Sequence, residues 1–205
     1  MTKFIVFDVE TTGLSKMDEV IQFAGFVLDE TFNPTSVVNF YSDTQVPITP
    51  GAFNVHRLTK AKLHELGKGV FFEDNWESFT DTIRQHQVVW IDWCRGSFDC
   101  RMINQTLENN GLPEYFHFPV STDLKECLKN KFSVFDLMGA LCHKLGKSSL
   151  NLAQAVSMLP YTKSQINYVY DDITRNAPNV DRELRYHNAL YDAFTTTLLL
   201  KYYFS

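Results

Sequence analysis

Apolar residues recur along this chain in two periods, one typical of strands and one typical of helices. The run Phe4–Phe7 is β-branched and aromatic, as expected of a buried strand. Residues 19–43 predict two more strands joined by a turn at Phe32–Pro34, which would extend the first into an antiparallel unit of three. QVVWIDW (87–93) predicts a fourth strand, and the segment from His117 predicts a short fifth strand that leads into a helix.

Helical spacing dominates the rest of the chain. Phe72, Trp76, Phe79 and Ile83 form one apolar stripe, which is more typical of a core than of a cofactor site. Further helices are expected over 58–67, 97–111, 148–160 and, as one long helix, 181–204. The polar segment 161–181 predicts a mobile loop. Strands first and then strands alternating with helices indicate an α/β fold with a mixed, five-stranded central sheet.

Composition narrows the class of protein. The 205 residues suit a single domain over 1–205, and 44% hydrophobic with 21% charged residues is typical of a folded chain. The four cysteines form no CxxC pair, and no apolar run could span a bilayer or serve as a signal peptide, so we expect a cytoplasmic protein with free thiols. The net charge of -5 argues against a large non-specific grip on duplex phosphates, although bound cations would reduce it.

Two acids follow the first strand directly, in FDVETTGL. Asp8 and Glu10 are two residues apart, so on a strand both side chains project from one face. An isolated pair of this kind is often only a solvated strand edge. As a site it predicts a divalent cation, because Mg²⁺ and Mn²⁺ prefer carboxylate oxygens and would relieve the repulsion between the two charges.

Further acids lie at other element junctions. Asp99 begins a predicted helix after a buried strand, and Asp192 lies in the apolar last helix, where burying an unpaired carboxylate would cost roughly several kcal/mol. His187 precedes Asp192 by five residues and could border the same pocket as a general base. Asp92 and Asp123 are also near strand ends, but we do not expect them in the metal site.

The segments FDVETTGL, SFD and HNALYDA, in this order, resemble the three motifs of the DnaQ-like DEDDh 3'-5' exonucleases, the family that includes the proofreading subunit of bacterial DNA polymerase III. NVHRLT resembles a fourth segment, VHGIT, and four segments in register are a strong signal. The resemblance implies an RNase H-like fold and two divalent cations, Mg²⁺ or Mn²⁺, with Asp8, Glu10, Asp99 and Asp192 as ligands and His187 as general base. Asn188 stands where the tyrosine subclass would place its tyrosine.

The resemblance also implies a pocket for the 3'-terminal nucleotide, lined by Thr11, Thr12, Leu14 and His56, with Leu14 wedged against a base. A surface position for His56 and a plain turn at Thr11–Gly13 are the alternatives. The chain departs from the family pattern at Cys94 and Arg95, which replace His and Asn, and at Arg57, which replaces glycine. Arg95 could instead contact phosphate.

The predicted activity is metal-dependent hydrolysis of DNA from single-stranded or frayed 3' ends, releasing nucleoside 5'-monophosphates. The partner is then 3'-terminal nucleic acid, with a polymerase or another replication or repair protein as a possible second partner. An RNA-trimming enzyme of the same fold is one alternative. A nuclease-fold binding module within a larger complex is the other.

Overall fold

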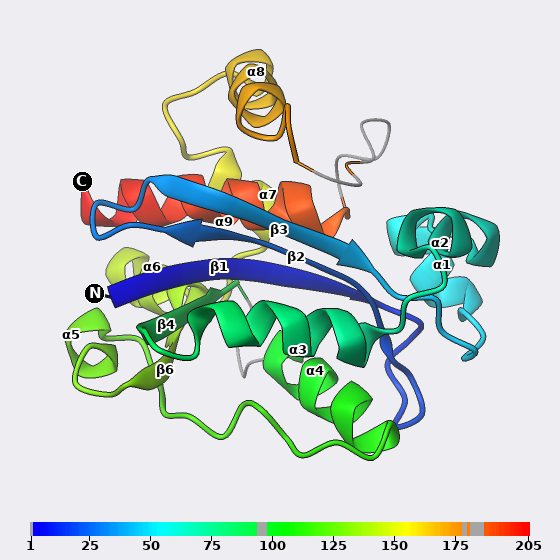
Figure 1. Ribbon diagram of the computed structural model, residues 1–205. Coiled ribbons are helices and arrows are strands. Elements are labelled where there is room, and N and C mark those ends of the chain that lie inside the picture. The colour runs from blue at the N-terminus through cyan, green and yellow to red at the C-terminus, as the bar shows by residue number, and fades with distance from the viewer. Residues whose placement is uncertain (1, 94–97, 178–179, 181–186) are drawn as a thin grey trace.

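A six-stranded mixed sheet forms the centre of the computed structural model, which describes residues 2–93, 98–177, 180 and 187–205 (Figure 1). Its strand order is β3-β2-β1-β4-β6-β5. Strands β1, β2 and β3 pair antiparallel with one another, as predicted, and β4, β6 and β5 run parallel to β1. The strands are β1 (Thr2–Thr11), β2 (Val20–Leu28), β3 (Pro34–Tyr41), β4 (Gln87–Asp92), β5 (Val120–Ser121) and β6 (Phe132–Asp136).

The expectation of five strands was wrong by one, because β6 was missed. Its five residues, FSVFD, are too few to show a period, and Ser133 interrupts the apolar run. Ser133 is nevertheless fully buried, and its hydroxyl donates to the Cys127 carbonyl at 3.0 Å. The strand is defined by its two neighbours, β4 and β5, between which it lies.

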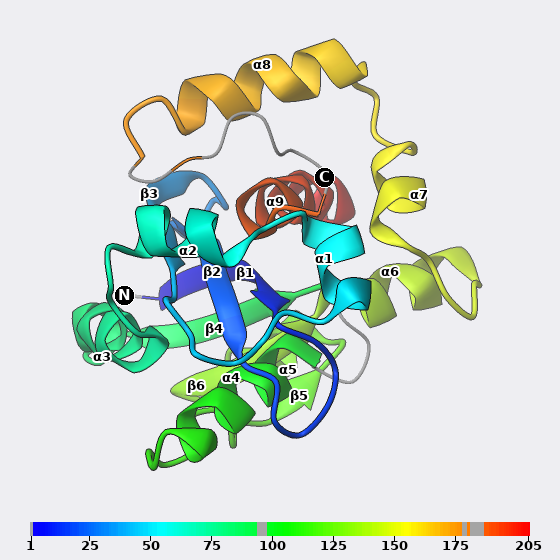
Figure 2. The same ribbon diagram turned by 90° about the vertical axis from the view of Figure 1, so that its right-hand side faces the viewer.

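Helices cover both faces of the sheet (Figures 1 and 2). One core packs α6, α7 and α9 against one face, with α8 on the outer side of α9, and a second core packs α3 and α4 against the other face. The short α1 and α2 lie beyond one end of the strands (Figure 1). The helices are α1 (Pro50–His56), α2 (Lys60–Gly67), α3 (Phe72–Ile83), α4 (Phe98–Asn109), α5 (Leu124–Cys127), α6 (Leu137–Leu145), α7 (Leu152–Val156), α8 (Lys163–Ile173) and α9 (Ala189–Phe204).

Strand β1 shows how alternation assigns side chains to these two cores. Phe4 and Val6 belong to the core under α9, whereas Ile5, Phe7 and Val9 belong to the core under α3 and α4. Because side chains alternate between faces, the next even-numbered positions, 8 and 10, also face α9. The two-residue alternation that buries the apolar side chains of β1 therefore also places its two carboxylates on one side of the sheet.

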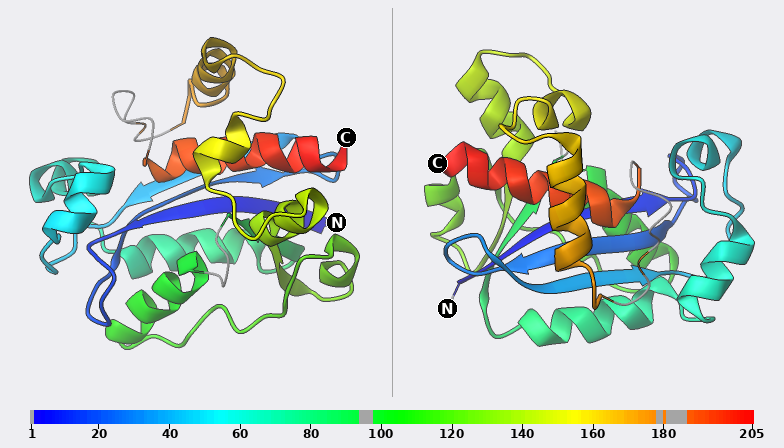
Figure 3. Two further views of the ribbon diagram at one scale, coloured as in Figure 1. Left: turned by 180° about the vertical axis from the view of Figure 1, so that it is seen from behind. Right: turned by 90° about the horizontal axis from the view of Figure 1, so that it is seen from above.

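The predicted mobile loop at 161–181 was wrong over Lys163–Ile173, which form α8. Thr162 and Gln165 make a capping box that starts this helix, and Ile166 and Tyr170 are buried beneath it. The many polar residues of the segment lie on the other face of an amphipathic helix. Seen from above, α8 crosses over α9 (Figure 3).

The last helix also begins later than predicted. Asn188 is its N-cap, and His187 just before it has φ of 55°, in the left-handed region, which a continuous right-handed helix excludes. Residues 181–186 of the predicted helix lie outside the described residues. Among the helices that the structure describes, none is both long enough and apolar enough to cross a membrane.

Candidate metal and nucleotide site

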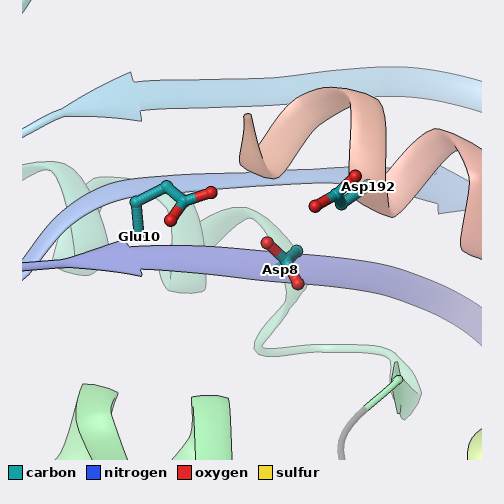
Figure 4. Close-up of side chains that lie close together, drawn as sticks. All are labelled: Asp8, Glu10 and Asp192. Atoms are coloured by element: carbon teal, nitrogen blue, oxygen red, sulfur yellow. The ribbon is translucent and has the colours of Figure 1, made fainter. Parts of the chain in front are cut away.

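Three carboxylates from two distant parts of the chain meet above the sheet. Asp8 and Glu10 project from β1, and Asp192 projects from the first turn of α9 (Figure 4). One oxygen from each side chain can be chosen so that all three atoms lie within 4.8 Å of one another. This spacing is compact enough for a single cation to reach all three groups.

The start of α9 determines where Asp192 points. The Asn188 side chain accepts a hydrogen bond from the Leu190 amide at 3.2 Å, and the Asp192 amide donates to the Asn188 carbonyl at 3.0 Å. Ala189, Leu190 and Ala193 are fully buried against the sheet, so the helix cannot turn without exposing them. The buried apolar face thus holds Asp192 over β1.

Asp99 approaches the same place from β4. Strand β4 runs parallel to β1, so both strands end at the same edge of the sheet, and α4 begins shortly after β4. Asp99 lies in the first turn of α4 and is only 4% exposed. It is outside the three-residue cluster, but its charge acts on Asp8 and Glu10.

Burial and mutual repulsion raise the pKa of all four carboxyl groups. For Asp8 and Glu10 the pKa lies well above the ordinary value, first because of burial and then because of the neighbouring acids. Burial and the charge of Asp192 raise the pKa of Asp99 to about 7. Burial also raises the pKa of Asp192 to about 7, although a hydrogen bond from the His187 backbone opposes the rise. Among the described residues, no positive charge contributes to the pKa of these four groups, and an all-oxygen set of this kind fits Mg²⁺ or Mn²⁺.

His187 directly precedes the N-cap of α9, next to the carboxylate cluster. Its side chain is exposed, and its backbone, rather than its ring, contacts Asp192. The left-handed φ of 55° turns the chain at this residue just before α9 begins. An exposed imidazole beside a carboxylate cluster remains free to approach a bound substrate.

A cavity of about 660 Å³ opens beside the carboxylates, at the end of β1. Its lining includes Glu10, which is also a member of the acidic cluster, and Thr11, Leu14 and His56. A volume of this size is within the usual range for small-molecule sites. Three of the four predicted nucleotide-binding residues therefore line one cavity, and this cavity adjoins the carboxylates.

Thr12, the fourth predicted residue, faces away from the cavity. It is fully buried, and its hydroxyl donates to Asp18 at 2.8 Å and accepts from the Glu19 amide at 3.0 Å. Its backbone pairs with Glu19 and with Thr49. Thr12 is thus part of the framework under the loop that carries Leu14.

His56 is the last residue of α1 and is 2% exposed, so the alternative of a surface histidine is wrong. Its Nδ1 accepts a hydrogen bond from the Leu58 amide at 2.9 Å. Burial lowers the pKa of His56, and the Thr11 backbone opposes this. A neutral ring is the form consistent with an acceptor at Nδ1.

The departure from the family pattern at Arg57 has a backbone consequence. Arg57 caps α1 with φ of 61°, and its amide donates to the Phe53 carbonyl at 2.9 Å. Glycine adopts this left-handed conformation freely, whereas another residue pays roughly 1–2 kcal/mol. The other departures, Cys94 and Arg95, lie outside the described residues.

The sequence analysis did not identify two residues that act at the cavity and at the carboxylate cluster. Phe98 lines the cavity next to Leu14, and only its position directly before Asp99 could have indicated this. Asp92, which we did not expect in the metal site, is fully buried at the end of β4, and its charge adds to the raised pKa of Asp8. The effect of Asp92 depends on strand pairing, which the local sequence does not show.

Carboxylates from β1, α4 and α9 gathered beside a cavity on an α/β domain are the arrangement expected of a metal-dependent nuclease. The profile of the exonuclease family RNase_T matches residues 5–152, and the chain belongs to this family. This confirms the family predicted from the motifs. No curated protein matches the chain in sequence.

Solved structures of exonuclease I share the fold. The zinc-bound complex of the E. coli enzyme with single-stranded DNA superposes with a TM-score of 0.63 at 18% identity, covering 98% of this chain and 40% of that one. The E. coli enzyme with a dA16 oligonucleotide has a TM-score of 0.64 at 18% identity, with coverage of 98% and 40%. Apo exonuclease I has a TM-score of 0.62 at 18% identity, with coverage of 98% and 41%. The chain spans about two fifths of the length of these relatives.

Proposed function

We propose that this protein removes nucleoside 5'-monophosphates from the 3' end of single-stranded DNA with the help of two divalent cations. The observation that carries the proposal is the junction of two features at Glu10, which belongs to the carboxylate cluster and also lines the 660 Å³ cavity. A 3'-terminal nucleotide in this cavity would present its phosphodiester to the carboxylates.

The four carboxylates would hold the cations. Asp8, Glu10 and Asp192 form the compact set, and Asp99 faces them from α4. Bound ions of this kind supply positive charge to a phosphodiester and lower the pKa of the attacking water. The raised pKa values support this assignment, because a cation would favour the charged forms that burial disfavours.

His187 would act as the general base. Its exposed ring lies at the start of α9, five residues before Asp192, where it can turn toward a water beside the terminal phosphodiester. It would take the proton of that water as the new phosphorus–oxygen bond forms. The leaving group is the 3' oxygen of the shortened strand.

The cavity residues would hold the terminal nucleotide. Leu14 is 76% exposed at the rim and would pack against the terminal base, while Thr11 and His56 would border the sugar. Thr12 would contribute by fixing the loop, since its hydroxyl is engaged by Asp18 and Glu19. Orienting the nucleotide in this way brings its phosphodiester into line with the carboxylates.

One point supports DNA as the substrate, and another supports a single strand. The similar exonuclease I structures include complexes with single-stranded DNA and with a dA16 oligonucleotide. The net charge of -5 suits a single strand end better than the phosphate array of a duplex.

The test is degradation of matched 5'-labelled DNA and RNA oligonucleotides with Mg²⁺, with Mn²⁺ and with chelator. The native protein should give a ladder that shortens from the 3' end of DNA only when metal is present, and Asp8→Ala should give none. Glu30→Gln, a substitution of an exposed acid, serves as the control and should behave like the native protein. A ladder on RNA alone would indicate the RNA-trimming alternative. No cleavage of either polymer would overturn the proposal in favour of a binding module.

A further inference from the structure

A second groove, of about 790 Å³, lies beside α4 on the other side of the loop Gly13–Met17. We propose that this groove binds the nucleotides of the single strand that lie 5' of the cleaved linkage. The inference rests on the proposed function, because it assigns the part of the substrate that the terminal-nucleotide cavity cannot hold. The occupant is one strand of nucleic acid, held through its phosphates and one base face.

The loop Gly13–Met17 contributes residues to both the groove and the cavity. Gly13 and Leu14 line the cavity, whereas Lys16 and Met17, two and three residues beyond Leu14, line the groove. A second connection runs through Phe98, which lines the cavity. The Arg101 guanidinium lies 5.0 Å from the centre of the Phe98 ring, and Arg101 lines the groove. A strand leaving the cavity therefore reaches the groove by crossing the loop.

Positive charge in the groove suits phosphate. Lys16 and Arg101 are exposed, and neither forms an ion pair with any residue in the described ranges. Glu108 and Glu114 also line the groove, but Glu108 follows Arg101 by seven residues, or about 10 Å along the helix. Arg101 lies beside Phe98 at the end next to the cavity, whereas the Lys16 carbonyl accepts from Asn109, which follows Glu108. We therefore expect phosphate contacts at Arg101 first and at Lys16 farther along the groove.

The loop is held in place by polar groups rather than by burial of its apolar residues. The Gln105 amide donates to the Ser15 carbonyl at 2.9 Å and to the Asp18 carbonyl at 2.5 Å, and Asn109 donates to the Lys16 carbonyl at 3.3 Å. The loop is thus fastened to α4, the helix that carries Asp99 in its first turn.

Asp18 holds the loop by hydrogen bonds to residues of the loop itself. Its carboxylate accepts from the Thr12 hydroxyl at 2.8 Å and from the Ser15 amide at 2.6 Å. Burial raises its pKa, but the hydrogen bonds from Ser15 and Thr12 outweigh this, so the net pKa is lowered. Asp18 therefore stays charged and keeps these bonds.

Because the loop is held in this way, Met17 remains 72% exposed in a fixed position on the groove side. Holding the loop backbone avoids the cost of ordering the loop when a base packs on Met17. Contacts to phosphates and stacking on the face of a base carry no sequence information, so the groove should bind strands without regard to sequence.

The test compares a long strand with a single nucleotide. A 5'-fluorescein dT12 with a cleavage-resistant phosphorothioate at its 3' linkage reports binding by anisotropy, and thymidine 5'-monophosphate reports the terminal cavity alone by isothermal titration calorimetry. The variant is Lys16→Ala with Arg101→Ala, and the control is Lys68→Ala with Lys147→Ala, which removes the same charge at two exposed lysines that do not line the groove.

The groove variant should bind dT12 about tenfold more weakly. Its plot of log affinity against log salt concentration should have a slope that is shallower by roughly 1.4, while its mononucleotide affinity stays unchanged. The control should match the native protein for both ligands. Met17→Ala should weaken dT12 a few-fold without affecting the mononucleotide.

An unchanged salt dependence, or equal losses in the control, would overturn the groove assignment. Cleavage of ordinary dT12 by the native protein is measured in parallel. Binding that depends on the groove without any cleavage would overturn the proposed exonuclease activity and leave the groove in place.

Discussion

Replacing Asp99 by asparagine should stabilise the metal-free protein at pH 8. Asp99 is 4% exposed, and its pKa is raised from 3.8 to about 7 by burial and by Asp192. Each pH unit of this difference corresponds to about 1.4 kcal/mol, so the charged form opposes folding by on the order of 4 kcal/mol. Asparagine has nearly the same shape and removes the charge, and it also relieves Asp8 and Glu10, on which Asp99 acts.

The sign of the pH dependence follows from proton binding. The folded state holds the Asp99 proton more tightly than the unfolded state, so the unfolding free energy of native protein is highest below pH 4. It should fall as the pH rises from about 4 to about 7 and then level off. The Asp99→Asn variant should lose less stability over this window, because only the other three carboxyl groups still contribute.

Urea unfolding followed by circular dichroism, in chelator at pH 5 and at pH 8, measures this effect. The gain from Asp99→Asn should be larger at pH 8 than at pH 5, and Glu30→Gln at an exposed acid should show no gain at either pH. Added Mg²⁺ should stabilise native protein more than the variant, which has lost a predicted ligand. Equal or lower stability of Asp99→Asn at pH 8 would refute the view that the buried Asp99 charge destabilises the metal-free protein.

Four other predictions concern single positions. His187→Ala should slow the chemical step by roughly 10²–10⁴-fold in single-turnover assays at saturating metal, and an unchanged rate would exclude it as the base. Gly13→Ala would place a Cβ 2.7 Å from an Asp18 oxygen, so chemical denaturation should show a free energy of unfolding lower by roughly 1–3 kcal/mol. An unchanged free energy of unfolding would mean that the loop can move to make room for the methyl group. Leu14→Ala should change stability by less than about 0.5 kcal/mol but raise the KM for oligonucleotides, and an unaltered KM would exclude the wedge. Thr162→Ala removes a helix cap and should cost about 1 kcal/mol by thermal unfolding without changing activity; lost activity would instead connect α8 to the site.

Local sequence determined the features that depend on neighbours along the chain. The alternation in β1 placed Asp8 and Glu10 on one face, and the structure has both facing α9. The stripe of Phe72, Trp76 and Phe79 predicted α3, and these side chains are buried in the core on the opposite face. Motif order predicted the family, which the profile match confirmed. Such features repeat every two or 3.6 residues, so a short window is enough to reveal them.

Tertiary structure decided everything that depends on distant segments meeting. Strand β6 exists because β4 and β5 flank it, and α8 because Ile166 and Tyr170 find a core to enter. The sequence placed Asp192 184 residues from Asp8, and only the packing of α9 on the sheet brings their oxygens within 4.8 Å. The raised pKa values follow from the same packing, since both burial and repulsion depend on distances through space, which no local pattern encodes.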